Sequence, residues 1–138
     1  MTPLNDALAG QYFQIEEMED KDSCTTEVLL KADRSVDVLE TNGPLYKAAY
    51  GSWKLENDSD FEMTLRRKYE GGQELKEPTD VGIFEFETVR IFRGRLNTIG
   101  AKMGVEGSIF DEERKVGFFE MIDSKEDSSL TGRAMAIS

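Results

Sequence analysis

Two alternating segments near the middle of the chain constrain the fold more than any other feature. The first covers residues 51–69 with a polar break at 57–60, and the second covers residues 83–92. In both, apolar and polar residues alternate with a period of two, which is typical of a strand with one buried face. They therefore predict an antiparallel hairpin, closed by a long loop over residues 70–80.

The charge pattern predicts a register for this hairpin. If Arg66 lies opposite Glu87 and Lys68 lies opposite Glu85, opposite charges meet on one face. A slip by one residue would place each apolar row beside a charged one, so the pattern disfavours it. The other face then carries the apolar and aromatic side chains together with two arginines: Phe61, Met63, Leu65, Arg67, Tyr69, Phe84, Phe86, Thr88, Arg90 and Phe92.

The remaining chain predicts further short strands. They are expected at residues 11–18, 25–32, 36–39, 101–109 and 116–122, with a bend at Gly94 and an undecided segment at 45–50. Scattered glycines within strands often mark the corners of a closed sheet. We therefore predict an all-β fold, an up-and-down antiparallel barrel of about eight strands, with a two-sheet sandwich as the alternative.

The domain prediction is simple. Residues 10–123 form one barrel domain, residues 1–9 an N-terminal arm with at most one short helix over 3–9, and residues 124–138 a C-terminal arm. A chain of 138 residues is long enough for one core of its own.

Composition excludes several function classes. The net charge of −11 and a pI near 4.5 disfavour nucleic acid and anionic lipid as primary partners. The chain has no histidine, the commonest general base, and its single cysteine, Cys24, is expected to be a half-buried structural thiol. No apolar run is long enough to span a bilayer, the N-terminus lacks the features of a secretion signal, and a lone cysteine fits a reducing compartment.

Gly51-Ser52-Trp53 resembles the Gly-x-Trp element of the calycin (lipocalin-like) barrels. The resemblance covers roughly residues 10–123 and implies a calycin-like barrel in which the tryptophan plugs one end beneath an arginine. Arg67, Arg90 and Arg95 are the candidates for a cation–π contact with Trp53.

A second set of segments resembles small soluble accessory proteins of algal plastids that accompany photosystem complexes. The segments are 43–44, 51–53, 61–65 and 116–123. This resemblance implies a location in the plastid stroma, peripheral to the thylakoid; without it the expectation is cytoplasmic.

Two functions remain. The first is a non-enzymatic accessory subunit docked on the stromal face of a photosynthetic membrane complex and stabilising its assembly. Its partner would be a larger membrane-embedded complex, contacted through acidic loops and the terminal arms. We expect no catalytic residues, cofactor or metal, because no catalytic motif is present and histidine, the commonest general base and metal ligand, is missing. Glu85 and Glu87 could serve as paired acid–base carboxylates, but they face basic partners that keep them ionised.

The alternative is a lipocalin-like carrier of a pigment or fatty acid inside the barrel. Arg67 and Arg90 would then bind an anionic head group. The apolar tail would contact residues of the aromatic face and their neighbours: Met63, Phe84, Phe86, Phe118 and Trp53. The simpler interpretation places both arginines at the rim, either snorkelling or paired with an acid. The carrier fails if large side chains fill the interior, and Phe13, Phe61, Phe84, Phe86, Phe92, Phe118 and Trp53 are expected to do so.

Overall fold

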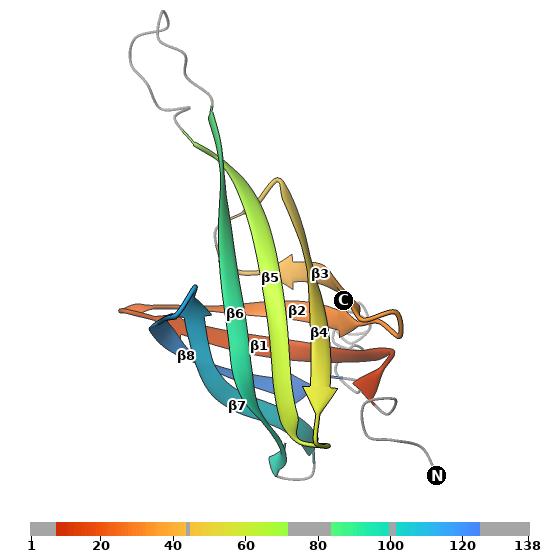
Figure 1. The fold of residues 1–138 in the computed structure, drawn as a ribbon. Coiled ribbons are helices and arrows are strands. Elements are labelled where there is room, and N and C mark those ends of the chain that lie inside the picture. The colour runs from red at the N-terminus through yellow and green to blue at the C-terminus, as the bar shows by residue number, and fades with distance from the viewer. Residues whose placement is uncertain (1–7, 44, 72–83, 100–101, 125–138) are drawn as a thin grey trace, which may run out of the picture.

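The computed structural model describes residues 8–43, 45–71, 84–99 and 102–124 as a closed antiparallel barrel (Figure 1). Each strand pairs with its neighbours in sequence, and β1 pairs with β8 to close the sheet. The all-β, eight-stranded barrel prediction is confirmed, and the architecture is consistent with the calycin resemblance. The strands are β1 (Gln11–Glu19), β2 (Asp22–Leu30), β3 (Ser35–Thr41), β4 (Ala48–Glu56), β5 (Asp60–Gly71), β6 (Phe84–Ile99), β7 (Lys102–Asp111) and β8 (Arg114–Asp123).

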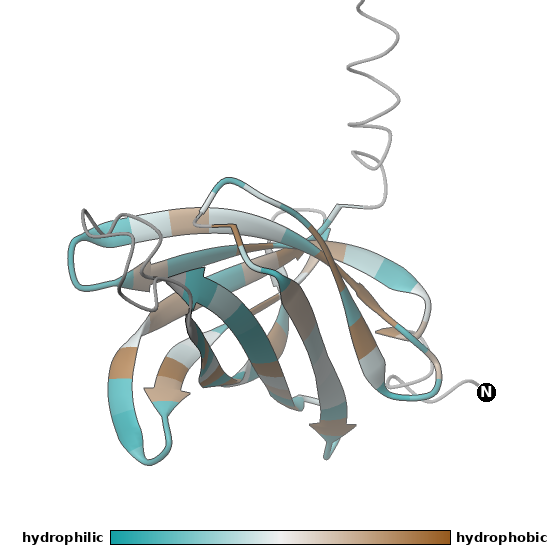
Figure 2. Ribbon diagram, turned by 90° about the horizontal axis from the view of Figure 1, so that it is seen from above, coloured by the Kyte–Doolittle hydropathy of each residue, from teal (hydrophilic) through white to brown (hydrophobic). Residues whose placement is uncertain are grey.

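The interior is a packed apolar core. Along the strands hydrophobic and hydrophilic residues alternate, so that one face of the sheet is buried (Figure 2). Leu8 is fully buried with the core, and the Gly10 amide donates to the carbonyl of Leu30. The predicted N-terminal arm therefore contributes to the barrel; residues 1–7 and 125–138, which hold the rest of both arms, lie outside the described part of the chain.

The connections of an up-and-down barrel alternate between its two ends. The β2–β3 turn lies at what we call the closed end, where the Trp53 indole donates to the Lys31 carbonyl at 2.9 Å. The guanidinium of Arg34 lies 4.4 Å from the centre of the Trp53 ring. A tryptophan thus plugs this end beneath an arginine, but the arginine is Arg34 and not the predicted Arg67, Arg90 or Arg95.

The register of the central hairpin differs from the predicted one by two residues. Lys68 lies opposite Glu87, and Arg66 lies opposite Val89. Because side chains alternate with a period of two, a shift by two residues keeps every side chain on its predicted face. The face pattern alone therefore cannot distinguish these registers. Arg66 still reaches Glu87 diagonally, at 3.6 Å.

The strand does not break at Gly94, where a bend was predicted, since β6 continues through it to Ile99. Gly94 lies opposite Gly107 of β7. A Cβ atom at Gly107 would overlap the backbone of Arg93 and Gly94. The two glycines thus let β6 and β7 approach closely at this point.

The β3–β4 seam is the weakest join in the barrel. Its ladder contains only Ser35 opposite Ser52 and Val36 opposite Gly51 among the described residues. The undecided segment 45–50 is an approach to β4, which begins at Ala48. The described residues include no helix long and apolar enough to cross a membrane.

The interior contains Phe119 and Met121 of β8, whereas Phe118 faces outward and is 54% exposed. The predicted place of Phe118 in the interior is therefore wrong. Both faces of β8 are apolar, so alternation along this strand does not identify the buried one.

Candidate functional site

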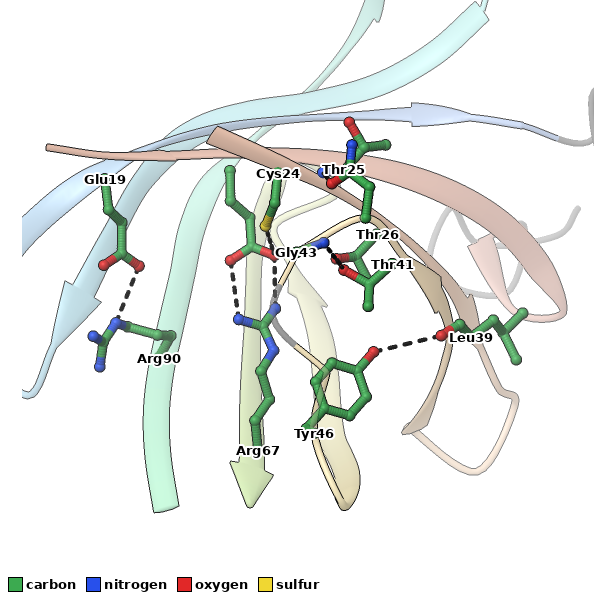
Figure 3. Close-up of polar contacts among 12 residues, drawn as sticks. Glu19, Cys24, Thr25, Thr26, Leu39, Thr41, Gly43, Tyr46, Arg67 and Arg90 are labelled. Carbon is green, nitrogen blue, oxygen red and sulfur yellow. Dashed lines mark hydrogen bonds and ion pairs between the residues drawn. The ribbon is translucent and has the colours of Figure 1, made fainter. Parts of the chain in front are cut away.

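A buried ion pair crosses the interior near the end opposite Trp53, which we call the mouth (Figure 3). Arg67 of β5 donates to both carboxylate oxygens of Glu17 of β1, at 3.1 and 2.6 Å. β1 and β5 are not neighbours in the sheet, so this contact spans the lumen. It joins residues far apart in sequence and separates the packed core from the space above it.

Burial and pairing act in opposite directions on Arg67, which is only 8% exposed. Burial by itself lowers the pKa of the guanidinium, but the charge and hydrogen bonds of Glu17 outweigh it and raise this pKa above its ordinary value. Arg67 is therefore charged at any physiological pH. Its Nε is buried and has no hydrogen-bond partner among the described residues.

The single cysteine belongs to the same cluster. The Cys24 thiol lies 3.8 Å from Glu17 Oε2 and donates to it. Burial, and next the charge of Glu17, raise the pKa of this thiol. The thiolate, which is the reactive form, is thereby disfavoured. The half-buried position predicted for Cys24 is confirmed.

A second arginine also lines the mouth. Arg90 of β6 donates to Glu19 at 3.1 Å and lies 3.8 Å from Asp111. Both predicted arginines are thus paired with acids, as the simpler interpretation expected, but Arg67 is buried in the lumen and not at the rim. An anionic ligand would have to compete with carboxylates already in place.

An open pocket of about 480 Å³ lies above the buried pair. This volume is within the usual range of small-molecule sites. Polar and charged side chains form most of its lining: Glu17, Glu19, Asp22, Ser23, Cys24, Asn42, Gly43, Arg67, Tyr69, Thr88 and Arg90.

Aromatic rings continue the pocket wall upward. Tyr69 of β5 stacks on Phe86 of β6 with ring centres 5.3 Å apart, and Tyr46 meets Tyr69 edge-on at 6.1 Å. Tyr69 lies opposite Phe86, so both rings are on the inner face of the hairpin. Phe86 is 46% exposed because the hairpin extends beyond the other strands at this point (Figure 1).

The predicted ligand residues separate into three groups. Arg67 and Arg90 line the pocket, and Phe86 lies above it. Met63 and Trp53 are buried in the core beneath it and do not line it. The side chain of Phe84 lies outside the described part of the chain.

Sequence reasoning missed Glu17, although a signal for it existed. In β1 the alternation places Glu17 on the same face as Phe13 and Ile15. An inward glutamate on one strand and an inward arginine on another suggest each other, because a buried charge requires a partner. Tyr46 was missed because its position depends on the 42–47 connection, which has no periodicity.

The two glutamates considered for acid–base chemistry are held on the outer face. Hydrogen bonding and charge from Lys47 lower the pKa of Glu85. Glu87 lies 3.6 Å from Arg66 and accepts a hydrogen bond from Tyr50. Glu85 is thus held ionised, and the described residues contain no group of three side chains placed to hold a metal ion.

Comparisons with protein-family models, with curated proteins and with solved structures gave no match.

Proposed function

We propose that this protein is a non-enzymatic subunit that docks on a larger protein complex. The observation that carries the proposal is an open strand edge. β7 pairs with β6 only from Ile91 onward, so residues 85–89 of β6 have β5 on one side and no described strand on the other. An unpaired strand edge is a template for a segment of another chain.

The backbone groups at this edge can be identified. The carbonyl of Lys68 accepts from Lys47 on the β4 side, so it points away from β6. Glu87, opposite Lys68, then directs its own N–H and C=O away from β5. With a period of two, Glu85 and Val89 do the same. Leu96 is an odd number of residues away from Glu85, Glu87 and Val89, so its N–H should point toward β5. Its amide does donate to the carbonyl of Ser59, next to β5, in agreement with this assignment.

The plastid part of the proposal is supported by resemblance alone. It places the complex at the stromal face of a photosynthetic membrane and gives the docked barrel a role in stabilising its assembly. An extract of the source cells, separated into soluble and thylakoid fractions, tests this part directly. Recovery of the protein only in a fraction without thylakoids contradicts it.

The docking itself is tested by native electrophoresis of the tagged full chain expressed in the source cells. We expect migration within a high-mass complex. Migration of the wild type solely as a monomer of 15.6 kDa overturns the proposal.

A matched pair of variants tests the edge. Glu87→Pro removes the outward N–H, whereas Glu87→Ala removes the same side-chain contacts with Arg66 and Tyr50 but keeps the N–H. We expect Glu87→Pro to be lost from the complex and Glu87→Ala to remain. Retention of Glu87→Pro would show that docking does not use this edge.

The pocket favours a second candidate, a carrier of a small amphipathic molecule. A polar head would lie above Arg67 and an apolar part against Tyr69 and Phe86. Calorimetric titration with oleate tests it. Binding that is lost in Thr88→Trp, which fills the pocket, supports the carrier, and no binding by the wild type contradicts it.

A further inference from the structure

The outer wall formed by β7, β8 and β1 exposes two large apolar side chains side by side. Met18 and Phe118 lie directly opposite each other in the β1–β8 ladder. They are 43% and 54% exposed. The ammonium group of Lys115 lies 4.0 Å from the centre of the Phe118 ring, and the described residues place no apolar cover over the pair.

A row of three glutamates crosses the same wall. Glu16 of β1 lies opposite Glu120 of β8, and Glu120 lies opposite Glu106 of β7. Directly opposed side chains in antiparallel strands are about 5 Å apart at Cβ, and like charges there are destabilising. Burial raises the pKa of Glu120, and hydrogen bonding and charge from Glu106, with the charge of Glu16, raise it further.

No described lysine or arginine forms an ion pair with any of these three glutamates. Arg95 lies opposite Glu106 across the β6–β7 ladder. Its guanidinium instead lies 3.5 Å from Asp60 and donates to Ser59. Within the described part of the chain the row therefore retains its repulsion.

The apolar pair and the glutamate row are adjacent. Glu16 and Met18 are two residues apart on the outer face of β1, and Phe118 and Glu120 are two apart on that of β8. Such spacing is about 7 Å along a strand. One segment of a partner can cover both features.

We propose that this face binds a basic amphipathic segment of a partner protein. Its cations lie over Glu16, Glu106 and Glu120, and its apolar side chains cover Met18 and Phe118. Charge complementarity identifies this occupant: a second copy, with a net charge of −11, and an anionic membrane are both repelled. The inference rests on the proposed docking function and adds the chemistry of the partner.

The probe for this face is a fluorescent ten-residue peptide of alternating lysine and leucine, titrated into the full-length protein and followed by anisotropy. We expect Glu16→Gln/Glu120→Gln to weaken binding about three- to tenfold. Met18→Ser/Phe118→Ser should weaken it by a similar factor. A lysine–serine peptide should bind more weakly to the wild type.

The matched control is Glu56→Gln/Asp58→Asn, which makes the same charge change at the β4–β5 turn, on strands far from β8 around the barrel. We expect it to alter affinity less than twofold. An equal loss in this control, or unchanged binding in Met18→Ser/Phe118→Ser, overturns the inference, because attraction would then be generic.

The two proposals fail separately. A wild type that binds the peptide but is monomeric in native extract overturns the docking function. A complex that persists when Glu16, Glu120, Met18 and Phe118 are all substituted overturns this inference and leaves the docking function in place.

Discussion

At the scale of single residues, this barrel holds two contrasting arrangements of charge, one inside the lumen and one on the outer wall. Arg67 and Glu17 satisfy each other inside the lumen, whereas Glu16, Glu106 and Glu120 repel one another outside it. Pairing inside the lumen stabilises the folded state. Repulsion on the outer wall destabilises it, and the cations of a bound partner would relieve this repulsion. Each leads to a measurement on the isolated protein.

Substituting Glu120 should stabilise the fold at neutral pH. Because the pKa of Glu120 is raised in the folded state, wild-type stability falls as pH rises from the ordinary glutamate value through the raised one. We expect Glu120→Gln to add about 0.5 kcal/mol at pH 7 and nothing below about pH 4, where the carboxyl is protonated. Urea denaturation at both pH values measures it; a difference independent of pH would contradict the repulsion.

Removing one member of the buried pair should be costly. Arg67→Met leaves the Glu17 carboxylate buried and unpaired, so we expect a loss of about 3–5 kcal/mol in the free energy of unfolding. Arg67→Met/Glu17→Leu should recover most of that loss, because neither charge remains. Denaturant midpoints of both variants are the readout, and a double variant as unstable as the single one would argue against an electrostatic origin.

At the scale of elements, the β3–β4 seam and the β5–β6 hairpin differ most in the length of their ladders. Among the described residues the seam ladder has two pairs, Ser35 with Ser52 and Val36 with Gly51, whereas β5 and β6 pair continuously from Asp60 to Gly71. Local opening occurs where backbone hydrogen bonds are few. The barrel should therefore open first between β3 and β4.

Hydrogen exchange tests this order. We expect the amides of Val38 and Ala49, which have no ladder partner across the seam, to exchange at least about tenfold faster than those of Met63 and Leu65 in β5. Equal protection of the two groups would show that the seam is closed in solution.

Much of the fold follows from the sequence, and the misses have physical causes. Alternation identified the buried faces of β1 and β5, down to Phe13, Ile15 and Met63. It did not fix the β5–β6 register, because a shift of two residues preserves every face. It also did not place Phe118, because both faces of β8 are apolar. Of the site, Arg67 and Arg90 were found as charges on an apolar face, whereas their pairing with Glu17 and Glu19 depends on which strands face each other across the lumen.

At the scale of the whole molecule, charge keeps the chains apart. The net charge of −11 at pH 7 falls toward zero near the pI of about 4.5. Exposed apolar side chains then meet without long-range repulsion.

We therefore expect light scattering to show a minimum of solubility near pH 4.5, relieved in Met18→Ser/Phe118→Ser. This variant leaves the net charge unchanged, so the comparison isolates the apolar pair. Undiminished scattering in the variant would place the self-association elsewhere.

The buried ion pair between Glu17 and Arg67 has one more consequence. It acts as a floor one layer below the rim, with the packed core beneath it. The barrel is therefore a shallow cup and not a deep vessel. A guest in it would keep one side in water and leave without any strand having to part, so exchange should be fast and retention brief.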